Sequence, residues 1–209
     1  DREIRDVCAQ QAKQWALGFS ETKEDDCPTY RLHNNGKHHN PLTAELRRLG
    51  LWGLLSPAKF VPTDYKLAAP AVRRDVLAGL LDTDGSKSTG GYDFISASER
   101  LAQDTVFLAR SVGLHASDPE PCSKSCPGYT GTYWRVFISG SGLSQLDMRI
   151  ARKKPDARTG TKRDVLRDGF TVEDAGVQKF AGITIEGDGR YLLDDFTVTH
   201  NTGKSACFA

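Results

Sequence analysis

Hydrophobic side chains recur at helical spacing near the start of the chain, at positions such as Ile4, Val7 and Trp15. This period places them on one face and predicts an amphipathic helix over roughly residues 3 to 17. Polar, turn-rich sequence then continues to Asn40. We therefore expect a helix followed by a long irregular stretch.

Three further helices are predicted. Asn40 is a suitable N-cap and Pro41 a suitable first residue for a short helix that ends at Gly50. Apolar periodicity predicts longer helices over about 70 to 82 and about 99 to 112. Strand-like sequence, about 92 to 96 and about 133 to 139, lies between and after these helices. This part of the chain is expected to be mixed α/β.

The C-terminal part has a different pattern. Strand-like segments separated by turn residues cover roughly 169 to 177, 180 to 186 and 191 to 199. Residues 187 to 202 have the pattern of a β-hairpin that contains the last of these segments. We expect an all-β module with its boundary near residue 158. No internal repeat and no low-complexity tract is evident.

Net charge is only +1 in 209 residues, which argues against a globally basic nucleic-acid binder. A local basic segment, however, carries eight cationic side chains against two acidic ones: Arg149, Arg152, Lys153, Lys154, Arg158, Lys162, Arg163 and Arg167, with Asp156 and Asp164. Such a run is usually a solvated linker. The first four residues are also candidate contacts to a phosphate backbone.

Composition is otherwise that of a globular protein, 38% hydrophobic and 26% charged. No membrane span or signal peptide is predicted, and the five scattered cysteines suggest reduced thiols inside a cell, in the cytoplasm or nucleus. Cys122 and Cys126 have zinc-like spacing, but a loop is the favoured interpretation. The absence of an initiator Met suggests a fragment.

The end of the predicted hairpin carries His200, Asn201 and Thr202. An Asn side-chain amide can attack its own carbonyl carbon and form a succinimide, which breaks the next peptide bond. His200 would protonate the leaving amine, and Thr202 would supply a hydroxyl nucleophile, without a cofactor. A surface turn is the simpler interpretation of this tripeptide, but the rigid strand before it favours the chemistry.

Residues 202 to 205, Thr-Gly-Lys-Ser, match the tail of a phosphate-binding loop, but Val198 stands where its first glycine belongs. Either the match is coincidental, or the front of the loop precedes this chain and excision up to Asn201 rejoins the halves. With the His-Asn pair, this end resembles the C-terminal splice junction of an intein inserted in a P-loop NTPase.

Residues 77 to 85, Leu-Ala-Gly-Leu-Leu-Asp-Thr-Asp-Gly, resemble the LAGLIDADG motif of homing endonucleases. Ala78 and Gly79 leave room for another helix to approach closely. Asp84 would project from the helix end, where two such helices bring two carboxylates together to hold Mg²⁺ at a scissile phosphate. The simpler alternative is a buried helix that ends at Asp-Gly.

The resemblance implies further site residues. Lys59 matches a lysine of intein endonucleases that lies near the active site and could polarise water or neutralise the transition state. A partner lysine is expected near residues 140 to 143 but is absent there, and Lys153 or Lys154 could replace it. Arg135 lies on one face of a predicted strand and could meet the DNA major groove, or form a surface salt bridge.

The resemblance implies an α+β fold: a LAGLIDADG homing endonuclease fold, a mixed α/β saddle, in residues 1 to 158, then the all-β C-terminal half of a Hint splicing domain in 159 to 201. Residues 202 to 209 would begin the downstream host sequence. Double-stranded DNA, the missing N-terminal intein half and the host NTPase are the implied partners, and no membrane is involved. Rival interpretations are a catalytically silent DNA-binding module, a single-motif homodimeric endonuclease and a P-loop NTPase.

Overall fold

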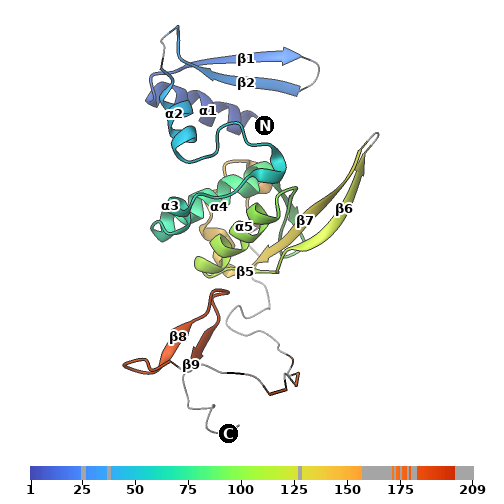
Figure 1. Cartoon of the computed structure of the whole chain (residues 1–209). Helices are drawn as coiled ribbons and strands as arrows, with labels where there is room; N and C mark the ends of the chain where they lie inside the picture. Colours follow the sequence, from blue (N-terminus) through green and yellow to red (C-terminus); the bar gives the residue numbers. More distant parts are fainter. Residues whose placement is uncertain are drawn as a thin grey trace. The chain divides into compact units, whose positions relative to one another are not determined.

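The computed structural model describes residues 1–24, 27–36, 39–126, 129–156, 171, 173–174, 176–177, 179 and 183–200. The chain divides into two compact units, Asp1–Thr161 and Lys162–Ala209. Both are drawn in Figure 1. No helix within the described ranges has both the length and the hydrophobicity to cross a bilayer.

The first unit is built around an antiparallel sheet. Its strands are β3 (Gly85–Ser88), β4 (Gly91–Ser96), β5 (His115–Ala116), β6 (Glu120–Cys126) and β7 (Tyr129–Ser139), in the order β3-β4-β7-β5 with β6 also paired to β7. Helices α4 (Pro70–Asp84) and α5 (Glu99–Ser111) alternate with these strands along the chain. The mixed α+β class predicted from the sequence is confirmed.

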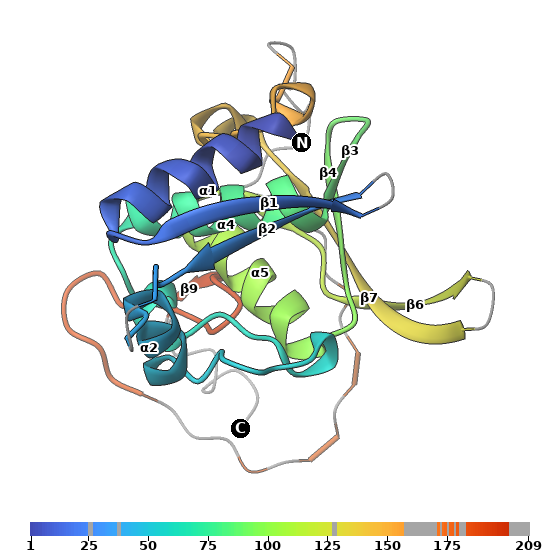
Figure 2. The same cartoon turned by 90° about the horizontal axis from the view of Figure 1, so that it is seen from above.

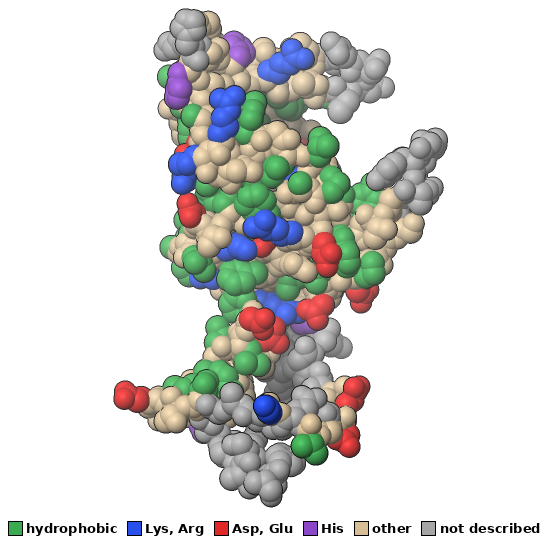
Figure 3. Space-filling view, viewed as in Figure 1, with side chains coloured by type: hydrophobic (Ala, Val, Ile, Leu, Met, Phe, Trp, Pro, Cys, Tyr) green, Lys and Arg blue, Asp and Glu red, His purple; other side chains and the backbone are tan. Residues whose placement is uncertain are grey.

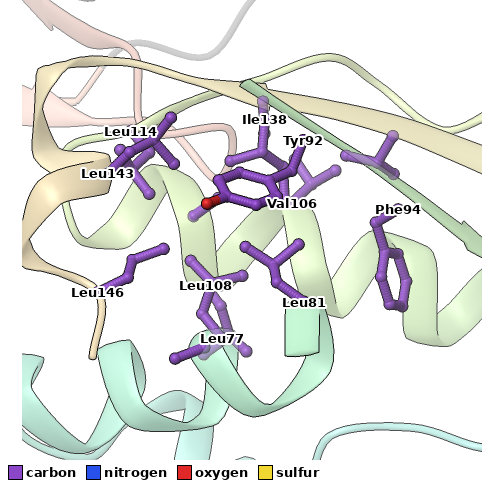
Figure 4. Close-up of a cluster of buried hydrophobic side chains, with 14 of the residues drawn as sticks. Leu77, Leu81, Tyr92, Phe94, Val106, Leu108, Leu114, Ile138, Leu143 and Leu146 are labelled. Atoms are coloured by element: carbon purple, nitrogen blue, oxygen red, sulfur yellow. The ribbon is translucent and has the colours of Figure 1, made fainter. Parts of the chain in front are cut away.

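Helices α4 and α5 cover one face of this sheet, and the core lies between them (Figure 4). Tyr92 and Phe94 alternate inward along β4 and pair with Ile138 and Val136 of β7. Leu81 of α4 is fully buried against this layer. Burial of each such side chain stabilises the fold by about 1.5–3 kcal/mol.

The predicted helices occur close to their expected limits. Helix α2 (Pro41–Arg48) begins after Asn40, whose side chain accepts a hydrogen bond from Thr43 N at 3.2 Å. Gly50 has a positive φ of 71°, as expected for the residue that ends such a helix. The short helix α3 (Thr63–Lys66) was not predicted.

Helix α1 (Arg2–Gln14) is followed by a hairpin of β1 (Gly18–Glu24) and β2 (Cys27–His33). The expectation of irregular sequence up to Asn40 was therefore wrong. Phe19 and Tyr30 stack at 5.8 Å between ring centroids, and Arg5 of α1 lies over Phe19. Figure 2 shows α1 running beside this hairpin.

Helices α1 and α5 begin two helix–hairpin units of the same pattern, the α1 unit and the α5 unit, although no repeat is evident in the sequence. Both helices have 13 residues. A left-handed residue follows each, Ala16 (φ 54°) and Gly113 (φ 82°). In each case the next leucine is buried and its N–H returns to a buried alanine carbonyl: Leu17 to Ala12 at 2.8 Å, and Leu114 to Ala109 at 3.0 Å.

A hairpin follows each helix, and β1 pairs with β2, as β6 pairs with β7, over seven residues. The second hairpin carries β5 before it and a longer β7. Because β6 is a strand, the loop expected at Cys122 and Cys126 was a wrong prediction.

The described part of the second unit contains one small hairpin of β8 (Arg190–Leu192) and β9 (Val198–His200). The hairpin confirms that part of the prediction, but a turn interrupts the single strand expected over 191 to 199. The described residues of the other two predicted strands, 169 to 177 and 180 to 186, are not in strands.

Candidate active site at the end of helix α4

Helix α4 ends in two carboxylates with opposite environments. Asp84 is exposed, and its carboxylate has a 3.5 Å contact with Thr83 Oγ1. Gly85 begins β3 directly after it, where a Cβ would lie 2.6 Å from the carbonyl oxygen of Leu81. Only glycine fits this turn from helix to strand, so the close turn presents Asp84 at the helix end.

Asp82 is only 2% exposed and accepts hydrogen bonds from the backbone N–H groups of Arg149 (2.7 Å) and Ile150 (3.1 Å). A buried carboxylate needs such donors, because an unpaired one is costly. Asp82 therefore anchors the segment that follows the sheet to the end of α4. The sequence motif contains both carboxylates, but only the tertiary contact separates a structural Asp82 from an available Asp84.

Lys153 belongs to that same segment and is buried. Its Nζ donates to the last carbonyls of α4, on Leu81 (3.0 Å), Asp82 (2.5 Å) and Thr83 (3.4 Å). The carbonyl of Leu81 also accepts from the backbone N–H of Gly85, and a cation at this helix end complements the helix dipole. Burial lowers the pKa of Lys153, as does Arg152, whereas Asp82 and Asp84 act in the opposite direction.

The expected DNA contact by Lys153 does not fit this burial. Its ammonium is a C-cap of α4. Tyr92 secures the segment further, because its hydroxyl donates to the carbonyl oxygen of Lys153. Burial, followed by Asp156 and Asp82, raises the pKa of Tyr92 to about 12. The sequence suggested a DNA contact because Lys153 belongs to the basic segment, but membership of that segment does not reveal whether a side chain is buried.

Lys59 is exposed, and its backbone is held by α5. Its carbonyl oxygen accepts a hydrogen bond from Ser98 Oγ at 2.6 Å. Ser98 follows the end of β4, whose Phe94 pairs with Gly85, the residue after Asp84. The loop of Lys59 is thus attached to the sheet near the end of α4.

Lys154 occupies a local setting much like that of Lys59. Each lysine follows a three-residue 3-10 helix, Ser56–Ala58 or Ala151–Lys153. Each has extended backbone, with φ −67° and ψ 149° at Lys59 and φ −56° and ψ 142° at Lys154. Their side chains are both exposed. Of the two lysines proposed as a partner for Lys59, Lys154 is the one available to a ligand.

One face of α4 is open. Gly79 is exposed, and a Cβ added there would meet nothing within 4 Å. Val72 and Thr83 are also exposed along this helix. Among the described residues, nothing fills the space that the small side chain at position 79 leaves.

The sheet face opposite α4 and α5 carries Arg135. Its side chain is 51% exposed and forms a 2.7 Å ion pair with Asp93 on the neighbouring strand. The sequence suggested either a DNA contact or a surface salt bridge for Arg135. The side chain lies on the open face of the sheet and also forms a salt bridge. An exposed pair of this kind contributes little stability and leaves the guanidinium accessible.

The other predicted DNA contacts lie near the start of the basic segment. Arg149 pairs with Asp147 at 3.4 Å, and Arg152 with Asp1 at 2.8 Å. On the face of the first unit in Figure 3, cationic side chains are dispersed among apolar and polar ones. Arg158 and the following basic residues lie outside the described residues.

At the predicted splice junction, His200 lies in β9 opposite Arg190 of β8. Arg190 is bonded to Asp188 through both its backbone N–H (3.0 Å) and its Nε (2.6 Å). The pKa of Asp188 is lowered, first by the bond from the Arg190 backbone. Asn201 and Thr202 lie outside the described residues.

Within the described ranges, no group of three or more His, Cys, Asp or Glu side chains could hold a metal ion. Asp84 would therefore need ligands from elsewhere. Cys8 and Cys122 are free thiols.

A comparison with models of protein families finds no match. The chain is similar to a "Replicative DNA helicase DnaB" from Mycobacterium intracellulare, with 32% identity over 173 residues. The match covers 77% of this chain and 28% of that protein, so the chain spans little more than a quarter of its relative. A helicase relative fits the P-loop NTPase host expected from the C-terminal sequence.

Proposed function

We propose that this chain is part of an intein that carries a LAGLIDADG homing endonuclease and interrupts a replicative helicase of the DnaB type. The observation that carries the proposal is the end of α4. There an exposed Asp84 follows the open helix face at Gly79 and comes directly before a turn into β3 that only glycine can make. This is the arrangement that two paired helices need in order to bring two carboxylates together.

The two helix–hairpin units support the same proposal. If the whole endonuclease consists of two copies of one layout, each copy would contain a helix, two strands, a second helix and a second hairpin. Helix α4, β3 and β4 precede the α5 unit along the chain. Helix α1 and its hairpin match the second part of such a copy. This argues against a single-motif homodimer, because parts of two copies are already in one chain.

The length of the helicase match supports an insertion. The aligned 173 residues far exceed residues 202 to 209, the stretch assigned to the host. Most of the similarity therefore falls on the sequence assigned to the intein. A helicase that contains such a stretch is the expected relative of an intein in the same host. A P-loop NTPase function of this chain itself is disfavoured by Val198 at the first glycine position.

The DNA cleavage site would combine Asp84 with a second carboxylate from a helix on the open face of α4. An exposed carboxylate fits Mg²⁺, which usually binds one or two protein carboxylates and keeps several waters. The bound ion would stabilise charge on the attacked phosphate. Lys59 and Lys154 would place positive charge beside that phosphate, and Arg135 would contact the duplex from the sheet.

At the splice junction, the side-chain nitrogen of Asn201 would attack its own carbonyl carbon. The bond to Thr202 breaks, a succinimide forms, and His200 supplies the proton that the leaving amine takes up. Thr202 would first have accepted the upstream host segment on its hydroxyl. These steps require the N-terminal splicing half.

The test of the endonuclease uses the whole intein, including the sequence that precedes Asp1. Parent protein and Asp84→Asn are incubated with DNA that carries the uninterrupted host gene, with and without Mg²⁺. We expect the parent to cut both strands and Asp84→Asn to bind without cutting, because the change removes charge but little volume. Binding without cutting by both proteins would instead identify a silent DNA-binding module.

A further inference from the structure

The loop that carries Lys59 is fixed by the N-cap of α5 and by a side chain within that helix. Ser98 Oγ donates to the carbonyl oxygen of Lys59 at 2.6 Å, and Asp104 Oδ2 accepts from Val61 N at 2.8 Å. One bond comes directly at the lysine and the other two residues later. The backbone is thus held at Lys59 and just after it, while the Lys59 side chain remains exposed.

Both side chains are buried and fully engaged. Ser98 is 1% exposed and is also the N-cap of α5, since its Oγ accepts from Leu101 N at 3.1 Å. Asp104 is 6% exposed, and its other oxygen binds Lys66 Nζ at 2.5 Å. Buried hydrogen bonds of this kind, which at Asp104 are also charge-assisted, set the geometry closely, since each partner is costly to leave unpaired.

A related contact holds the loop of Lys154. There the first turn of α1 supplies the partners: Glu3 accepts from Ala151 N at 3.2 Å, and Asp1 binds Arg152 at 2.8 Å. Hydrogen bonds from backbone N–H groups, first that of Glu3 itself and then that of Ala151, lower the pKa of Glu3, whereas desolvation acts in the opposite direction. Ser98 at the start of α5 and Glu3 in the first turn of α1 thus each bond the backbone of a loop that carries an exposed lysine.

We propose that Ser98 and Asp104 are positioning residues for Lys59, and that the first turn of α1 has the same role for Lys154. This inference rests on the proposed nuclease. A cation acts on a transition state only if its position is fixed, and a displacement of about 1 Å can cost 10²-fold in rate. Helix α5 supplies that fixation through the backbone of the loop.

The experiment measures kcat and KM for DNA cleavage by the whole intein, in single and double variants. Ser98→Ala should lower kcat about 10-fold with KM unchanged, because Lys59 is freed but binding groups are intact. In a Lys59→Ala background, the same change should have no further effect on kcat, since Ser98 acts through Lys59. Asn40→Ala removes a helix cap of α2 and serves as the control with parental kcat.

Asp104→Asn provides a second route if Ser98→Ala folds poorly, since it keeps an acceptor for Val61 N but loses the ion pair with Lys66. It should show the same dependence on Lys59. Equal losses of kcat with and without Lys59, or parental kcat in both variants, would overturn the inference while leaving the nuclease intact. Failure of the parent to cut DNA would instead overturn the proposed function.

Discussion

The α1 and α5 units share a layout but differ in how deeply they are buried. Seven residues of α5 are buried, whereas Ala12 is the one buried residue of α1. The reason is what each helix packs against. Helix α5 packs against α4 and against strands β4, β5 and β7 of the main sheet, whereas α1 contacts the two-stranded β1–β2 hairpin.

This difference indicates what the α1 unit lacks, namely a second helix and a larger sheet to pack against. An exposed two-stranded hairpin and one helix form a small core, because few apolar side chains can be removed from water. Under the proposed function, sequence that precedes α1 in the whole intein supplies the counterpart of α4, β3 and β4. The open face of α4 at Gly79 would receive that counterpart.

The largest effect should come from the two exposed lysines. If the units are equivalent, Lys59→Ala and Lys154→Ala should each lower kcat for DNA cleavage by about 10²-fold to 10³-fold at similar affinity. Single-turnover rates and filter binding in the whole intein measure this. Loss of binding with Lys59→Ala would make Lys59 a phosphate anchor, and a silent Lys154→Ala would break the equivalence.

Matched core substitutions should show the difference in burial. Leu101 and Ile4 are each the third residue of their helix, but Leu101 is 7% exposed and Ile4 is half-buried. In this chain, Leu101→Ala should cost about 2–5 kcal/mol in free energy of unfolding and Ile4→Ala clearly less. Urea unfolding followed by circular dichroism measures both free energies. Equal losses of unfolding free energy would mean that the α1 unit is as well packed as the α5 unit.

The C-cap of α4 should affect stability rather than DNA affinity. Lys153→Met keeps most of the side-chain volume but removes the ammonium that donates to the carbonyls of Leu81 and Asp82. We expect a loss of about 1–3 kcal/mol, measured by thermal unfolding. Lys154→Met, its exposed neighbour, is the control and should be near parental stability.

The smallest effect concerns the open sheet face. Arg135→Gln should weaken DNA binding modestly, since the guanidinium is already paired with Asp93. One lost phosphate or base contact should also reduce the salt dependence of affinity, measured by anisotropy at several salt concentrations. Unchanged affinity at all salt concentrations would leave Arg135 as a surface ion pair.

The sequence predicted the helices well because their apolar residues recur with one clear period. It missed β1 and β2, where Phe19, Tyr30 and Leu32 are too few to stand out among polar neighbours. It also missed the repeat, since the units match in backbone geometry at Ala16 and Gly113 more than in residue type.

The candidate site was predicted in part. Asp84 and Lys59 could be named because they belong to recognisable motifs. The burial of Asp82 and Lys153 could not, because each depends on partners about 70 positions away in the chain. A charge in a basic run gives no local signal that tertiary contacts will enclose it.

The central claim, that this chain is part of an intein, is tested most directly by intact-mass measurement after mixing the chain with an N-terminal splicing half. The parent should lose residues 202 to 209 and end at Asn201 or its succinimide. His200→Ala should slow this, and Thr202→Ala should block transfer but allow some cleavage. Asn201→Ala should retain the whole tail, because alanine has no side-chain amide that could attack the carbonyl carbon. Release of the tail from Asn201→Ala at the parental rate, or no release from the parent, would contradict the account.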